Sequence, residues 1–226
     1  MADAESPAKR VKLDFSEHLR VLVGPNKQEF MVHKDVITRR SSFFQAAASQ
    51  RWSGSGSGKV IELSDDDPAV FSAYLECLYT GVVHVDDQLC SDGFLALKLY
   101  MLADKLGDLK SMNCIIDSII KWSDRHRELP DTPSATYVVA NTMEISPLRR
   151  LMVDFHVQES AKDALDDVIA KSPLLCGAIL KEFGRLKAGN LDLKVRKVFN
   201  QACNKRPKCY YHQHDEQCPP CASDSA

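Results

Sequence analysis

The sequence has no run of apolar residues long enough to cross a membrane, which would take about 20 in succession. Its first residues, MADAESPAKRVKLDF, also lack the apolar stretch that follows the charges of a secretory signal. We therefore expect a protein that stays inside the cell and makes no use of a membrane. Because thiols there are normally reduced, the eight cysteines do not predict a disulfide framework.

A large excess of charge of either sign is also missing. The formal net charge is −2, so the chain as a whole has no general attraction to nucleic acids or membrane surfaces. Familiar catalytic patterns are absent as well, including G-x-S-x-G, G-x-x-x-x-G-K-[ST] and H-E-x-x-H. His33 is interpreted as a structural histidine, and the carboxylates of residues 65–67 as helix-capping groups. We do not expect an enzyme.

What the first half of the chain does contain is short apolar runs that alternate with helical patterns. A β-branched run is followed by Gly24-Pro25-Asn26, which is typical of a turn. Asp67-Pro68 predicts the start of a helix, and Thr80-Gly81 predicts its end. Strands are expected at Leu19–Val23, Glu29–Val32, Val60–Leu63 and Val82–Val85.

Helical spacing dominates the rest of the chain. Leucines at 95, 99, 102, 106 and 109 are spaced 4, 3, 4 and 3 residues apart, which predicts one helix with a leucine stripe that packs into the core. The charged, proline-containing stretch 125–133 is interpreted as a linker. Beyond it, apolar residues at helical spacing predict a series of helices, the last over 191–199.

Five short motifs follow one another in a specific order through this first half. They are Phe30-x-Val32-His33-Lys34, Ser42-Phe43-Phe44, Asp66-Asp67-Pro68-x-x-Phe71, Leu78-Tyr79-Thr80-Gly81 and Leu102-Ala103-Asp104-Lys105. In this order they resemble the BTB/POZ domain family, especially its fungal branch. The stretch from Ser146 to Asp154 also resembles the helical region of fungal members.

The resemblance implies an α/β (α+β) fold, in which a small sheet is flanked by helices and followed by an all-helical C-terminal extension. The implied organisation is an N-terminal tail (1–17), a BTB/POZ domain (18–124), a helical extension (134–202) and a Cys/His-rich tail (203–226).

Members of this family act by binding other proteins. Many are adaptors that bring a substrate to a cullin-type ubiquitin ligase, and others are nuclear scaffolds or transcription regulators. The resemblance thus implies a non-enzymatic interaction module with protein partners, a cullin among them. Dimeric animal members use an N-terminal helix and a charged pocket, whereas residues 1–18 here are mostly polar and His18, Leu19 and Lys34 stand near the pocket positions. These differences argue against a symmetric homodimer.

The N-terminal tail carries a basic motif. Pro7-Ala8-Lys9-Arg10-Val11-Lys12-Leu13-Asp14 closely resembles a short nuclear import signal. In an extended segment, Lys9, Arg10 and Lys12 would bind the acidic and aromatic groove of an import receptor. The alternative is a solvated run of charge. The motif predicts a nuclear protein, and without it the protein would remain in the cytoplasm.

The C-terminal tail concentrates cysteine and histidine. Cys209-x2-His212 and Cys218-x2-Cys221 are two pairs at zinc-ligand spacing, and these four ligands could close a tetrahedral structural zinc site. Two alternatives stay open, a redox dithiol at Cys218 and Cys221 and a tail without a metal. A zinc-dependent nucleic-acid binder that uses Lys205, Arg206 and Lys208 is the alternative function.

Overall fold

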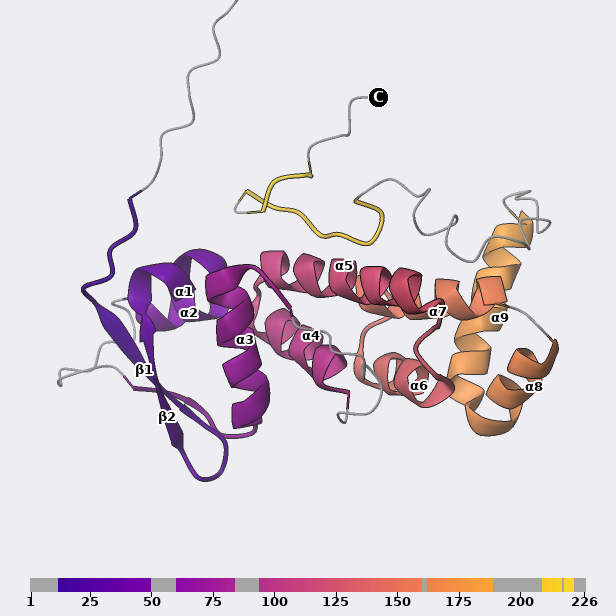
Figure 1. The fold of residues 1–226 in the computed structure, drawn as a ribbon, viewed down its shortest axis with the longest axis horizontal. Helices are drawn as coiled ribbons and strands as arrows, with labels where there is room; N and C mark the ends of the chain where they lie inside the picture. The colour runs from indigo at the N-terminus through magenta and orange to yellow at the C-terminus, as the bar shows by residue number, and fades with distance from the viewer. Residues whose placement is uncertain are drawn as a thin grey trace, which may run out of the picture.

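The computed structural model describes residues 12–49, 60–83, 94–159, 162–188, 209–216 and 218–221. Its first part is a small mixed sheet with helices, and its second part is helical (Figure 1). Figure 1 shows the sheet at one end of the molecule and helices α6 to α9 at the other. Within the described ranges, no helix has the length and apolar character to cross a membrane.

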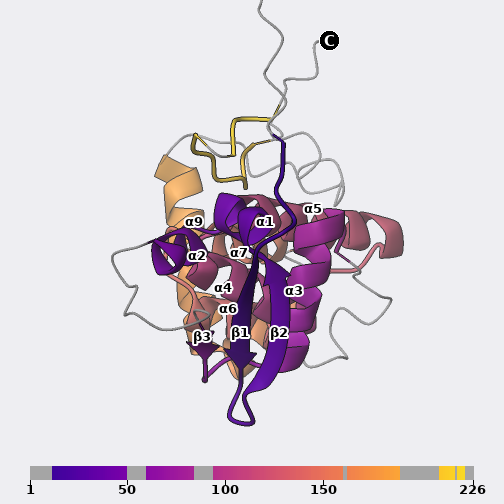
Figure 2. The same ribbon diagram turned by 90° about the vertical axis from the view of Figure 1, so that its left-hand side faces the viewer.

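The sheet has the strand order β2-β1-β3 over the described residues. Strands β1 (His18–Val23) and β2 (Gln28–His33) form an antiparallel hairpin, and β3 (Val60–Leu63) runs parallel to β1. Alternate residues of β1 and β3 are buried, as expected for strands with one face on a core. Figure 2 looks onto the sheet, with the helices behind it and to its sides. Three of the four expected strands are thus confirmed.

The prediction of a fourth strand over Val82–Val85 is wrong for the two residues that the structure describes. Val82 and Val83 follow the end of helix α3 (Pro68–Thr80) and are not part of a strand, while residues 84 and 85 lie outside the described ranges. Two apolar residues after a helix-ending glycine do not make a strand without a neighbouring strand to pair with. The start and end of α3 are confirmed, since Asp67 caps it, Pro68 opens it and Gly81 ends it with a φ of +70°.

Helices α1 (Lys34–Arg40) and α2 (Ser42–Ala48) follow the hairpin. The prediction of a single leucine-striped helix is wrong, because the stripe is divided between two helices, α4 (Leu95–Leu106) and α5 (Leu109–His126). Gly107, with a φ of +66°, ends α4, and Asp108 caps α5. The leucine spacing continues across the break at Gly107 because Leu99, Leu102 and Leu106 pack into the same core as the apolar residues of α5.

A buried charged network holds these helices together. Asp108 is fully buried, and its carboxylate accepts from the Arg40 guanidinium at 3.2 Å and from the Tyr74 hydroxyl at 3.2 Å. The same carboxylate accepts from the backbone N–H of Ser111 at 3.0 Å and from its hydroxyl at 2.8 Å. Burial and the nearby charge of Asp108 raise the pKa of Tyr74, so its hydroxyl stays protonated and donates. One carboxylate therefore joins α1, α3 and α5.

The helical extension consists of α6 (Thr132–Asn141), α7 (Pro147–Glu159), α8 (Lys162–Lys171) and α9 (Pro173–Ala188). Helices α7 and α9 pack against each other and against α6, with Leu148, Leu151, Met152, Leu175 and Ile179 buried. The predicted linker contains the connection between α5 and α6, although α5 runs past residue 124 to His126. The helix expected over 191–199 lies outside the described residues.

Candidate functional site

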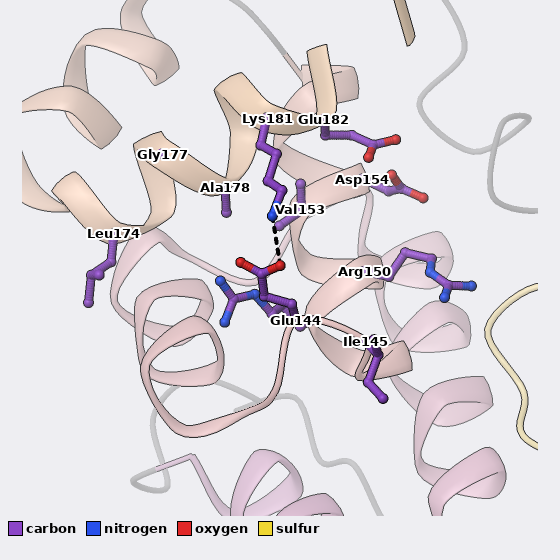
Figure 3. Close-up of a pocket in the computed structure, with 11 residues that line it drawn as sticks. Glu144, Ile145, Arg150, Val153, Asp154, Leu174, Gly177, Ala178, Lys181 and Glu182 are labelled. Carbon is purple, nitrogen blue, oxygen red and sulfur yellow. Dashed lines mark hydrogen bonds and ion pairs between the residues drawn. The ribbon is translucent and has the colours of Figure 1, made fainter. Parts of the chain in front are cut away.

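A groove opens on the surface of the helical extension, between the α6–α7 connection and helices α7 and α9 (Figure 3). Its volume is about 580 Å³. Apolar side chains lie at its edges, where Ile145 is 72% and Leu174 61% exposed, and Gly177 and Ala178 lie along the α9 wall. Exposed apolar side chains beside a concave surface are typical of a site that binds another molecule.

Charged groups frame this groove. Lys181 of α9 pairs with Glu144 at 2.6 Å, as the dashed line in Figure 3 shows. The hydrogen bond from Lys181 lowers the pKa of the Glu144 carboxyl. Both side chains are about two-thirds exposed, so this pair adds little to stability and instead gives the groove a polar rim. An apolar surface with a polar rim is the arrangement that protein interfaces share.

A second candidate lies in the C-terminal segment (209–216 and 218–221), drawn in yellow in Figure 1. Cys209, His212, His214 and Cys221 each offer one ligand atom, and these four atoms lie within 4.8 Å of one another. Two thiolates and two imidazoles are a ligand set that zinc binds in tetrahedral structural sites. This group, which we call the Cys/His group, could therefore bind a metal ion.

The structure brings together three of the four predicted zinc ligands. Cys209, His212 and Cys221 are in the Cys/His group, and His214 takes the place expected for Cys218. The thiol of Cys218 instead lies 3.6 Å from the Nδ2 of Asn113. Sequence spacing missed His214 because it treated the pair separated by two residues as the ligands, although His212-x-His214 was visible in the same segment.

A cavity of about 710 Å³ is lined by the C-terminal segment, the end of α3 and α5. Cys77 and Cys114 line it, together with Cys218 and Cys221 of the segment. As a thiol, Cys114 donates to the Gly81 carbonyl at 3.1 Å. As a thiolate it accepts a hydrogen bond from Cys77, which lowers the pKa of Cys114 to about 7. Cys114 is therefore a half-buried thiol with unusual acidity.

The remaining predicted residues are placed only in part. Lys12 is exposed, while Lys9 and Arg10 lie outside the described residues. His33 is confirmed as a hydrogen-bonded histidine, since its Nδ1 lies 3.0 Å from the Tyr79 hydroxyl. Asp67 is a helix cap as expected. None of the described residues among them, Lys12, His33 and Asp67, forms a nucleophile with an adjacent base.

The model of the BTB/POZ domain family matches residues 18–111 of the chain. No curated protein matches the chain as a relative. The match covers the three strands, α1 to α4 and the start of α5, and with the mixed sheet it shows that this chain contains a BTB/POZ domain. BTB/POZ domains mediate protein–protein interactions, so this part of the chain is a protein-interaction module.

Proposed function

We propose that this protein is a non-enzymatic adaptor that brings a partner to a cullin-type ubiquitin ligase. The observation that carries the proposal is the BTB/POZ domain over residues 18–111, directly continued by a helical extension with an open apolar groove. A rigid platform of this kind binds through a few anchors that fill pockets and needs no reactive group. The exposed Ile145 and Leu174 are the apolar contacts that the groove offers to the cullin.

The test is binding of a purified cullin N-terminal domain to the full chain, measured by isothermal titration calorimetry. Leu174→Glu places a charge in the groove and should weaken binding at least tenfold, which is about 1.4 kcal/mol. Leu180→Glu is the matched control, because Leu180 lies on the same helix, is 62% exposed and does not line the groove. Absence of binding by the wild-type chain would reject the adaptor role and leave a scaffold that binds other proteins.

We propose that the N-terminal basic motif directs the protein into the nucleus. Its support is the sequence match from Pro7 to Asp14 and the exposed position of Lys12. Arg10→Ala with Lys12→Ala, in a fusion too large to diffuse through the nuclear pore, should move the protein to the cytoplasm. Replacing the exposed Lys121 and Arg125 by alanine removes the same charge and should change nothing. Nuclear signal that is equal in both variants would reject the motif.

We propose that the cofactor of this protein is one structural zinc ion in the Cys/His group. Support comes from the ligand set and from the close approach of its four donor atoms. The nucleic-acid-binding alternative has less support. The Cys/His group lies against the protein body, where His212 contacts Asp117 of α5, and the three basic residues at 205, 206 and 208 lie outside the described ranges. Salt-sensitive binding of mixed DNA in fluorescence anisotropy, lost on deletion of 201–226, would revive it.

A further inference from the structure

The C-terminal segment has little apolar contact of its own. Its described residues form no helix or strand, and Tyr211, 4% exposed, is its one buried apolar side chain. Ordering a backbone costs about 1–2 kcal/mol per residue, and small units with so little core usually need a disulfide or a metal. A further source of order is therefore required to hold this segment in place.

The segment nevertheless makes specific contacts with α5, the helix whose first residues lie at the end of the BTB/POZ match. Asn113 of α5 donates from Nδ2 to the Gln213 carbonyl at 2.8 Å and accepts from the Gln213 N–H at 3.0 Å. This pairing satisfies both backbone groups of one residue, as a strand neighbour would. The position of Gln213, between the two histidines of the Cys/His group, is thereby set by α5.

The same segment contacts the helical extension. The Tyr211 hydroxyl donates to Asp154 of α7 at 2.7 Å, and both side chains are buried. Arg150, one turn earlier on α7, donates to the Tyr210 carbonyl at 3.1 Å, with its guanidinium 5.4 Å from the Tyr210 ring centre. The segment therefore contacts two parts of the molecule, α5, whose start lies within the BTB/POZ match, and α7 of the extension.

The hydrogen bonds of His212 leave one nitrogen for a metal. Its Nε2 lies 3.0 Å from the Asp117 carboxylate, so this nitrogen carries the proton and donates. Its Nδ1 is then the acceptor nitrogen, and it lies 3.2 Å from the Cys221 thiol, a hydrogen bond that zinc bound to both atoms would replace. Two ligands on a tetrahedral zinc stand roughly 3.5 Å apart, given bonds of about 2.0 and 2.3 Å. A histidine that binds a metal with one nitrogen and a carboxylate with the other is a common metal-site arrangement.

In His214, too, one ring nitrogen donates to a protein oxygen and the other is left for a metal, but the two nitrogens are exchanged relative to His212. Its Nδ1 lies 3.2 Å from the Cys218 carbonyl and donates to it. Its Nε2 is buried and has no hydrogen-bond partner in the described part of the chain. An unsatisfied buried polar atom costs about 1–3 kcal/mol, so its presence in a folded protein calls for an explanation. A zinc ion at the centre of the Cys/His group would supply the partner.

We infer that zinc bound by Cys209, His212, His214 and Cys221 is a clasp that fixes the C-terminal segment across α5 and α7 and so joins the BTB/POZ domain to the helical extension. The inference rests on the zinc proposed above. Asp117 is a positioning residue that orients His212, and Cys218 is not a ligand. Zinc links the two ends of the segment to each other, and the contacts to α5 and α7 depend on that fixed shape, so without zinc the segment leaves α5.

The ligand set is tested by the zinc content of the purified full chain and two matched cysteine variants. Wild type and Cys218→Ser should each retain about one zinc per chain, and Cys221→Ser and His214→Gln should lose it. No zinc in the wild type would reject the cofactor itself. Zinc lost in Cys218→Ser but kept in His214→Gln would reject this ligand set and favour the pairs expected from spacing.

The clasp is tested by hydrogen exchange of residues 209–221, with and without a chelator. Zinc removal should abolish protection of the segment while circular dichroism shows that the helices remain. Asp117→Ala should weaken zinc binding by about 10–100-fold in a chelator competition. Asp124→Ala, an exposed acid on the same helix, should not. If the chain binds zinc but removal of the zinc leaves the hydrogen exchange of the segment unchanged, the clasp is rejected and the zinc site is retained.

Discussion

Replacing Asp108 by alanine should strongly destabilise the BTB/POZ domain, because this carboxylate is the buried partner of Arg40. The Asp108 side chain is fully buried, and the Arg40 side chain is 18% exposed. Alanine removes the N-cap of α5 and the acceptor of the Tyr74 hydroxyl at the same time. Three buried donors, namely the Tyr74 hydroxyl and the N–H and hydroxyl of Ser111, lose this acceptor together with the partly buried Arg40 guanidinium.

The size of the effect follows from these contacts. Removing one partner of a buried ion pair costs about 3–5 kcal/mol, because the other charge stays buried without compensation. Arg40 keeps its hydrogen bonds to the Ser111 hydroxyl at 2.9 Å and to the Leu78 carbonyl at 3.4 Å, which favours the lower end of that range. We expect a loss of about 3 kcal/mol in the free energy of unfolding, or roughly 6–12 °C in Tm for a chain of this size.

Urea denaturation followed by circular dichroism measures this free energy. Asp131→Ala is the matched control, since Asp131 caps α6 in the same way, accepting from Ser134 N–H at 2.9 Å, but is exposed. Its loss should cost about 1 kcal/mol, the usual value of a cap. Equal losses for Asp108→Ala and Asp131→Ala would refute the reasoning, because the buried charge would then contribute nothing beyond capping.

Two further predictions concern the backbone conformation at Gly107 and the acidity of the Cys114 thiol. Gly107→Ala should lower the free energy of unfolding by about 2 kcal/mol, because its φ is positive and the new Cβ would overlap the Ser42 hydroxyl. Gly81 also has a positive φ but its new Cβ would meet open space, so Gly81→Ala should lower it by about 1 kcal/mol. Equal losses for the two variants in urea denaturation would contradict this reasoning. Alkylation of Cys114, followed by mass spectrometry of its peptide, should rise with pH with a half-point near pH 7, because the hydrogen bond from Cys77 lowers the pKa of Cys114 to about 7 and the thiolate is the reactive form. A half-point near 8.5, the value of an ordinary thiol, would show that this hydrogen bond does not stabilise the thiolate.

Prediction from sequence succeeded where neighbouring residues carry the signal. The hairpin, the capped start of α3 at Pro68 and its end at Gly81 all follow from residues within a few positions of one another. It failed at the leucine stripe, because the period alone does not distinguish one helix from two that share a core. Gly107-Asp108 was the available signal, a helix-ending glycine followed by a capping residue.

The Cys/His group shows the same limit. Spacing alone identified three of the four residues that the structure brings together, since ligands close in sequence stay close in space. The fourth depended on a local turn, in which the Asp215 N–H donates to the Cys218 carbonyl at 3.0 Å and the Cys218 N–H donates to the Asp215 carboxylate at 2.7 Å. That turn directs the Cys218 thiol to Asn113, a residue 105 positions away that no local pattern could indicate.

By itself, the sequence determined the fold class, the three strands, the two ends of α3 and the residue types from which a metal site can be built. These depend on backbone preferences, capping and hydrophobic period, which act over a few residues. Only the tertiary structure decided that Arg40 pairs with Asp108 and that the C-terminal segment lies across α5 and α7. Contacts between residues that are 57 to 100 positions apart depend on how the whole core packs, because burial and the pairing of buried polar groups are set by every element at once.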